Sequence, residues 1–277
     1  MTIDAHHHFW KYDAVDYDWI DDSMQKIRRD FGPEHLAVEI SEAGVDAVIS
    51  VQARQTLGET TWLLENARNN DFIKGVVGWV PLVSPTVTKD LDRIMTEPKL
   101  RGVRHVLQGE PDGFMLRDDF NAGICALRSR DLIYDILVFE HQLSETIEFV
   151  DRHPAQVFVL DHIAKPRVKA DLLEPWKANL HELAKRENVF CKLSGVVTEA
   201  NWTDWSVEQL RPYVETVIDA FGPSRLMFGS DWPVCNVAGG YQQMLSVVKN
   251  YTSTLSADEQ ARFWGQNAVE FYNLDQI

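Results

Sequence analysis

Residues 134–140 read YDILVFE, a short run in which apolar residues are nearly continuous. Such a run is typical of a strand in a parallel sheet that is buried on both faces. Seven further runs of this kind lie at Thr2–His6, Asp46–Gln52, Ile73–Val80, Leu100–His105, Val157–Asp161, Val189–Leu193 and Arg225–Gly229. We therefore expect eight strands.

Segments with helical periodicity separate these runs. They include Thr60–Asn70, Asp118–Arg130, Ser144–His153, Leu172–Glu187 and Val207–Phe221, the last of which is closed by Gly222 and Pro223. Eight strands alternating with helices in 277 residues predict a closed (β/α)8 TIM-type barrel. An open doubly wound sheet would need a glycine-rich phosphate turn after the first strand, where this chain has histidines instead.

The composition predicts one domain over residues 1–277, because the chain is 45% hydrophobic and no Pro/Gly/Ser-rich linker interrupts it. A net charge of -15 argues against a nucleic-acid partner, which would require clustered Lys and Arg.

Neither a membrane span nor a secreted protein is expected. No apolar stretch reaches the ~18 residues of a membrane span, and the opening MTIDAHHHFW is unlike a signal peptide. Cys125, Cys191 and Cys235 are too scattered for a disulfide framework. We therefore expect a cytoplasmic protein.

Catalytic residues of such a barrel lie where the strands end and the following loops begin. Unusual polar residues occur at these positions in six of the eight strands: His6, His7 and His8; Arg101, Arg104 and His105; Glu140 and His141; Asp161 and His162; Lys192 and Ser194; Ser230, Asp231 and Trp232. This recurrence predicts an active site at one mouth of the barrel.

The alternation of strand side chains places His6 and His8 on one side and His7 on the other. Two converging imidazoles can bind a divalent metal or an oxyanion, or they can simply cap the strand with hydrogen bonds. Asp231 likewise has two interpretations. It caps the following turn, or it is the carboxylate that deprotonates water beside the histidines. Taken together, these residues favour the catalytic interpretation.

Four segments carry a resemblance to a known family: IDAHHHFW, VLDHIAKP, CKLSGVVTEANW and RLMFGSDWPV. They resemble the amidohydrolase-related lactonases, with the nearest likeness to bacterial hydrolases of L-fuconolactone and other sugar lactones. The likeness extends from Ile3 to Asn273. It implies hydrolysis of a small-molecule sugar lactone to the sugar acid, with Asp231 as the general base.

The resemblance also implies a site for one divalent, zinc-like ion, with ligands from His6, His8, His162 and Asp231, although some lactonases of this kind work without a metal. It places Lys192, Ser194 and Trp232 near the sugar. From the residues themselves we expect Arg104 and His162 to assist catalysis as an oxyanion donor and a proton carrier. We expect His105 and His141 to bond substrate hydroxyls, and Trp10 and Trp19 to stack on the sugar or pack at the rim.

Three alternatives remain at this point. The substrate could be a planar lactone of the muconolactone or pyrone type, or the chain could be a metal-dependent decarboxylase of aromatic acids. A non-catalytic sugar-acid binding protein is the third. A serine hydrolase is disfavoured because no GxSxG segment is present. The sequence is compatible with a homo-oligomer and does not define one.

Overall fold

The computed structural model describes residues 1–274 and contains one sheet of eight parallel strands in chain order. The strands are β1 (Ile3–His7), β2 (Ala47–Val51), β3 (Ile73–Gly78), β4 (Leu100–Val106), β5 (Ile133–Leu137), β6 (Phe158–Leu160), β7 (Val189–Leu193) and β8 (Leu226–Phe228). Each of the eight predicted strands is confirmed, and the boundaries differ by a few residues at most.

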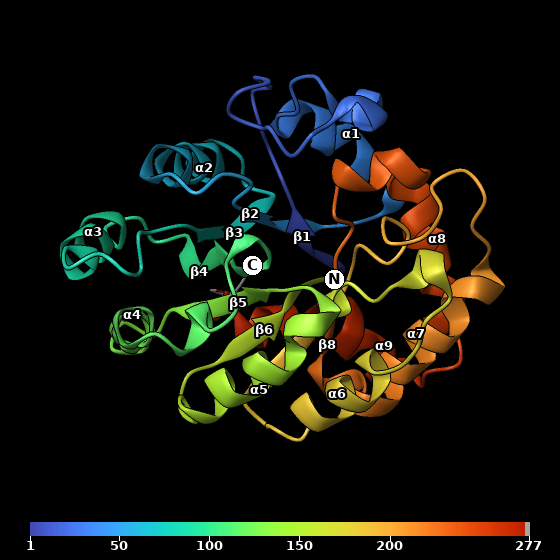
Figure 1. Ribbon diagram of the computed structural model, residues 1–277. Helices are drawn as coiled ribbons and strands as arrows, with labels where there is room; N and C mark the ends of the chain where they lie inside the picture. Colours follow the sequence, from blue (N-terminus) through green and yellow to red (C-terminus); the bar gives the residue numbers. More distant parts are fainter. Residues whose placement is uncertain (275–277) are drawn as a thin grey trace.

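The sheet closes on itself where the chain following β8 meets β1. The backbone N–H of Asp231 donates to the carbonyl of His6 at 2.8 Å, and that of His8 donates to the carbonyl of Trp232 at 2.7 Å. Figure 1 shows the strands at the centre, with α1 to α8 surrounding them in chain order. The predicted (β/α)8 TIM-type barrel is therefore confirmed.

The principal helices are α1 (Pro33–Ala43), α2 (Leu57–Asn69), α3 (Val87–Ile94), α4 (Asp118–Arg128), α5 (Leu143–Asp151), α6 (Trp176–Leu183), α7 (Val207–Phe221), α8 (Tyr241–Thr252), α9 (Ala257–Ala261) and α10 (Asn267–Phe271). Short helical turns lie at Asp22–Ile27, Leu107–Gly109, Phe114–Leu116, Glu140–Gln142, Asp161–Ala164, Val168–Ala170, Pro223–Arg225, Val234–Ala238 and Arg262–Gln266. The five helices predicted from periodicity are all present, but α6 is four residues shorter than expected at each end.

Local chemistry explains several helix boundaries. Helix α7 begins after Ser206, whose hydroxyl accepts the backbone N–H of Gln209 at 3.2 Å. It ends at Gly222, where a φ of 68° favours glycine. Among residues 1–274 we find no helix whose length and apolar content would let it traverse a bilayer.

The barrel interior is layered from bottom to top. Apolar side chains fill the layer toward the amino-terminal ends of the strands: Ile3, Ala5, Ala47, Ile49, Val77, Ile133, Val159 and Met227. Ala268 and Tyr272, from the C-terminal helical segment, pack against this layer. A layer of buried charged side chains lies above it, and the carboxyl ends of the strands open above that into a cavity.

Candidate active site

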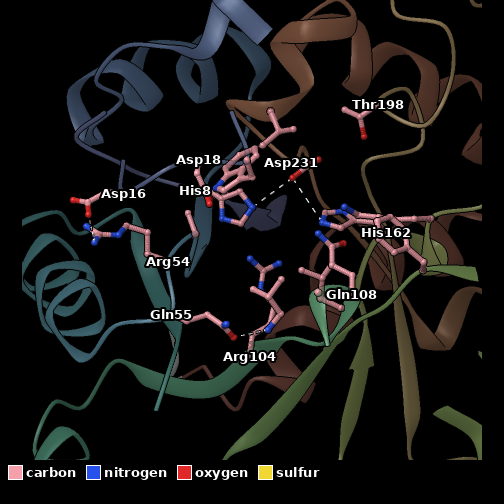
Figure 2. A pocket seen from close by; sticks show the side chains of 18 of the residues that line it. His8, Asp16, Asp18, Arg54, Gln55, Arg104, Gln108, His162, Thr198 and Asp231 are labelled. Carbon is pink, nitrogen blue, oxygen red and sulfur yellow. Dashed lines mark hydrogen bonds and ion pairs between the residues drawn. The ribbon is translucent and has the colours of Figure 1, made fainter. Parts of the chain in front are cut away.

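A cavity of about 690 Å³ opens at the carboxyl ends of the strands. Figure 2 shows His8, His162 and Asp231 pointing toward one another inside it, with Arg104 on the wall. Its lining also includes Val15, Asp16, Asp18, Trp19, Arg54, Gln55, Val106, Gln108, Leu137, Phe139, Lys165 and Thr198. This placement follows the rule that barrel active sites form from the loops after the strands.

An irregularity in β1 directs its histidines. Asp4 pairs with Val48 but His7 pairs with Ser50, so β1 has one residue more than β2 over this interval. A bulge of this kind changes the direction of the side chains that follow it. His6 and His8 consequently face the interior, whereas His7 faces outward with its Nε2 2.9 Å from the Ser50 hydroxyl.

The hydrogen-bond partners of His6 and His8 indicate which nitrogen of each ring carries the proton and which carries the lone pair. Nδ1 of His8 lies 2.8 Å from the carbonyl oxygen of Val51, which can only accept, so Nδ1 carries the proton. Nδ1 of His6 lies 3.2 Å from a carboxylate oxygen of Asp161, and its Nε2 lies 3.4 Å from Nη1 of Arg104, which can only donate. In the neutral rings, both Nε2 atoms therefore present lone pairs, and they lie 3.2 Å apart.

His162 enters the cavity from the turn that follows β6. Its Nδ1 lies 2.9 Å from the Ser194 hydroxyl, and its Nε2 lies 3.8 Å from Oδ1 of Asp231. Gly195 makes room for the ring, because a Cβ added there would lie 2.7 Å from Nδ1 of His162. Gly195 also has a φ of 64°, a conformation that residues with a side chain rarely adopt.

Asp231 lies at the centre of the site. Its Oδ1 is 3.5 Å from Nε2 of His8 and 3.9 Å from Nε2 of His6. The carboxylate thus faces imidazoles. Among the described residues, the side chain of Asp231 accepts no backbone N–H group from the turn that follows it, although a capping side chain would do so. This geometry favours the catalytic interpretation of Asp231 over the capping one.

The surroundings of this cluster set its protonation. Burial alone would raise the pKa of Asp231, but the neighbouring His162, His8 and Lys165 outweigh it and lower the pKa. Burial lowers the pKa of His162 to about 4, although Asp231 and Asp161 act in the opposite direction. At neutral pH the arrangement is a carboxylate beside a neutral imidazole, which suits proton abstraction from water.

Charged side chains support the site from below. Lys192 is fully buried, and its ammonium lies 2.5 Å from Asp135 and 3.1 Å from Asp161. Arg104 donates to Asp161 at 3.0 Å and to the side-chain oxygen of Gln52 at 3.1 Å. Such paired charges fix one another's orientation, so they hold the Asp161 carboxylate against His6.

Some of the predicted site residues lie at the cavity, and others lie beneath it or outside its lining. His6, His8, His162 and Asp231 come together, and Arg104 lines the wall. Lys192 and Ser194 are fully buried beneath the cavity, where they contact His6 and His162 respectively.

The three remaining candidates for substrate binding lie outside the cavity lining. His105 points outward from β4, stacks on Phe114 and bonds Glu110 at 2.7 Å. His141 is exposed and stacks on Phe139. Trp232 packs against Phe31 and is 1% exposed, so it presents no free face to a sugar.

Trp10 and Trp19 are each expected either to stack on the sugar or to pack at the barrel rim, and the structure places them differently. Trp19 lines the cavity and is 40% exposed, whereas Trp10 is fully buried and donates to the carbonyl of Arg29 at 2.9 Å. The two rings meet edge to face, with their centroids 5.8 Å apart. Trp10 therefore packs beneath Trp19.

Several cavity residues escaped sequence reasoning, among them Asp18, Arg54, Gln55, Gln108 and Lys165. Asp161, a polar residue at a strand end with no role predicted from the sequence, contacts His6, Arg104 and Lys192. The sequence feature that could have indicated a role for Asp161 is its position directly after β6 and next to His162. Lys165 stands in the VLDHIAKP segment, three residues beyond His162.

The donor set fits a divalent cation. Ligand atoms of His6, His8 and Asp231 lie within 4.8 Å of one another, and so do those of His6, Asp161 and His162. Facing lone pairs on two imidazoles beside a carboxylate repel one another unless a cation or proton lies between them. Nitrogen and carboxylate donors of this kind are the usual ligands of zinc.

The sequence profile of the amidohydrolase family matches residues 3–274. The chain belongs to this family. A relative named L-fucono-1,5-lactonase from Burkholderia multivorans is 41% identical over 288 aligned residues, which cover 100% of this chain and 97% of the relative. A protein of the same name from Burkholderia ambifaria is 38% identical and covers 100% and 97%.

Solved structures agree with this membership. The crystal structure of an amidohydrolase from Burkholderia multivorans superposes with a TM-score of 0.96, at 41% identity and 99% coverage of both chains. A second crystal form of an amidohydrolase from that organism, described with bound zinc, gives a TM-score of 0.94 at 42% identity and the same coverage.

Proposed function

We propose that this chain is a carboxylic ester hydrolase that opens the ring of a sugar lactone, with an L-fuconolactone-like 1,4- or 1,5-lactone as the preferred substrate. The observation that carries the proposal is the convergence of three histidines on the cavity-lining Asp231. Two relatives named L-fucono-1,5-lactonase, aligned over the whole chain, support the substrate class.

One divalent, zinc-like ion is part of this proposal, with ligands drawn from His6, His8, His162 and Asp231. The lone pairs that face one another in this cluster support it, as does the zinc bound to a relative of 42% identity. Such an ion, when bound, supplies Lewis-acid polarisation of a carbonyl oxygen.

The chain's own residues account for the proton movements. Asp231, held ionised by its neighbours, takes a proton from the attacking water as the new C–O bond forms at the lactone carbonyl. When the ring C–O bond breaks, the departing alkoxide receives that proton from Asp231. The net change is addition of one water molecule across the ester, giving a hydroxy acid.

Arg104 and His162 surround the reacting carbonyl in this proposal. The guanidinium of Arg104 is 3% exposed and fixed by Asp161 and Gln52, so it presents a preorganised positive charge to the cavity. His162 is oriented by the Ser194 hydroxyl toward Asp231. Lys192 and Ser194 thus serve as positioning residues below the substrate.

Recognition of the sugar falls to the cavity wall. The polar side chains of Gln55, Gln108 and Asp18 offer donors and acceptors to hydroxyl groups. Trp19 offers an exposed ring face to the sugar. We further propose that residues 1–277 act as one catalytic domain in the cytoplasm, with the small-molecule lactone as its substrate.

A lactone panel tests the proposed function. We expect proton release above the spontaneous rate from L-fucono-1,5-lactone and from related hydroxylated five- and six-membered lactones, measured with a pH indicator near neutral pH. The same panel contains a planar pyrone dicarboxylate lactone and an aromatic acid monitored for CO2. Preferential turnover of either one would overturn the assignment.

A further inference from the structure

Three cationic side chains line the active-site cavity: Arg54, Arg104 and Lys165. Two of them are already paired. Arg54 lies 2.7 Å from a carboxylate oxygen of Asp16, and Arg104 lies 3.0 Å from Asp161. In the described part of the chain, no carboxylate forms an ion pair with the Lys165 ammonium. Its charge is therefore left for a ligand.

The backbone that carries Lys165 is unusual. His162, Ile163, Ala164 and Lys165 have φ values of 50°, 51°, 60° and 46°, a left-handed turn without a single glycine. Non-glycine residues rarely adopt this conformation, and a run of four persists only where the surroundings hold it. The Lys165 N–H donates to the carbonyl of His162 at 2.8 Å, and the Trp176 indole donates to that of Ile163 at 2.7 Å.

This turn has a clear consequence for the cavity. Ile163 and Ala164, in its middle, are fully buried in the core. His162 and Lys165, at its two ends, both line the cavity. Strained backbone of this kind concentrates at functional sites. The turn thus presents an imidazole and an ammonium to the same ligand.

An aromatic ring positions the ammonium without neutralising it. Nζ of Lys165 lies 5.5 Å from the centroid of the Phe139 ring, within the range of a cation–π contact. Glu199, on the loop after β7, and Asp231 are near enough for Lys165 to act on them through space, yet neither forms an ion pair with it. Within residues 1–274 the ammonium thus contacts an aromatic ring, has no ion-paired carboxylate, and lines the cavity.

The proposed reaction produces negative charge at this location. The lactone carbonyl becomes an oxyanion during attack, and the product is a carboxylate in a protein whose net charge is -15. A local cation is needed to hold such an anion inside an acidic protein. We propose that Lys165 is a second anion-binding residue of the active site beside Arg104, contacting the carbonyl oxygen as charge develops and then holding the carboxylate of the ring-opened sugar acid.

This inference rests on the proposed function and adds a substrate-contacting residue to it. The contribution of Lys165 is electrostatic and forms no covalent bond. Because the contact strengthens as charge develops, its loss reduces kcat as well as product affinity.

Two variants of Lys165 and one control test the assignment. Lys165→Met removes the charge, and Lys165→Arg restores it in a similar volume. Lys169→Met removes an exposed lysine four residues along, outside the cavity lining. Circular dichroism and thermal unfolding establish that each variant is folded. Lactone turnover gives kcat/KM, and calorimetric titration with L-fuconate gives the product Kd without any turnover.

We expect Lys165→Met to lower kcat/KM and to raise the Kd of L-fuconate, each by about 10- to 100-fold, the usual effect of losing a charged hydrogen bond. Lys165→Arg should recover most of the product affinity, and Lys169→Met should change neither value. A Lys165→Met protein that binds L-fuconate as tightly as wild type would overturn the inference. If wild type opened no sugar lactone, the proposed function would fail, and the calorimetric comparison would still decide whether Lys165 binds the anion.

Discussion

The Ser194 hydroxyl lies 2.9 Å from Nδ1 of His162, and Nε2 of the same ring faces Asp231 at 3.8 Å. The bond therefore fixes which edge of the imidazole points into the cavity. A second buried serine–histidine pair has the same separation on the outer side of the barrel, where the Ser50 hydroxyl lies 2.9 Å from Nε2 of His7. The first pair includes a histidine that lines the cavity, and the second includes a histidine outside the cavity lining.

Ser194→Ala should lower kcat/KM by about 10- to 100-fold, as loss of a supporting hydrogen bond to an active-site histidine commonly does. Ser50→Ala removes the matched outward bond and should leave kcat/KM near wild type. Both variants should lose a similar free energy of unfolding, about 1 kcal/mol, because each deletes one buried hydrogen bond. Equal activity loss in the two variants would contradict a positioning role for Ser194.

Metal content provides the second prediction. Elemental analysis of the purified protein should find about one equivalent of a divalent ion, and chelation should abolish lactone turnover until zinc is restored. His8→Ala should lose most of this metal. His141→Ala changes an exposed histidine outside the cavity lining and should retain it. Metal-free protein with full activity would remove the ion from the proposal while leaving the lactonase assignment in place.

Most of the fold could be predicted because each strand is an apolar run buried on both faces. The principal site residues could be predicted for a related reason: His6, His8, His162 and Asp231 all stand at or just beyond strand ends. Asp161 shares that position, and only its network of partners distinguishes its role.

The errors of placement have a geometric origin. Arg104 and His105 are adjacent on β4, so alternation sends one inward and the other outward, where His105 stacks on Phe114. Asp231 and Trp232 also differ in direction, but they lie beyond the end of β8, and Asp231 has a left-handed φ of 57°. Alternation therefore accounts for the β4 pair, whereas the direction of Trp232 depends on the turn after β8. The left-handed turn at Lys165 has no comparable signal, because it contains no glycine.

The third prediction concerns the contribution of the buried Lys192 ammonium to stability. Lys192→Met leaves the carboxylates of Asp135 and Asp161 without their ammonium partner, and loss of a buried partner costs about 3–5 kcal/mol of unfolding free energy. Urea denaturation measures this loss. The double variant Lys192→Met with Asp135→Asn should regain part of it, since one stranded carboxylate is then neutral. A single variant as stable as wild type would show that the network adds no stability.

Glu59 gives a prediction about pH. Burial raises its pKa from 4.5 to about 7, although its carboxylate accepts the backbone N–H groups of Ala53 and Arg54. The folded protein therefore binds this proton more tightly than the unfolded chain. Its contribution to stability is fully present below pH 4.5 and is lost as the pH rises through about 7. Between pH 4.5 and about 7, the unfolding free energy of wild type should fall by up to about 3 kcal/mol more than that of Glu59→Gln, as measured by denaturation at each pH. Parallel pH profiles would contradict the assignment.

The last prediction concerns the base. Asp231→Asn preserves the shape of the side chain but cannot accept a proton from water, so kcat should fall by roughly 10²–10⁴. Substrate affinity should change far less, because the cavity wall that contacts the sugar is untouched. If Asp231 only capped the following turn, the substitution would instead lower stability by about 1 kcal/mol and spare turnover. Initial rates near neutral pH, where spontaneous lactone opening is slow, together with thermal unfolding and metal content of the same sample, separate these outcomes. Near-normal turnover by a folded, metal-loaded Asp231→Asn protein would shift the role of base to His162, since that imidazole is neutral at this pH and faces the same part of the cavity.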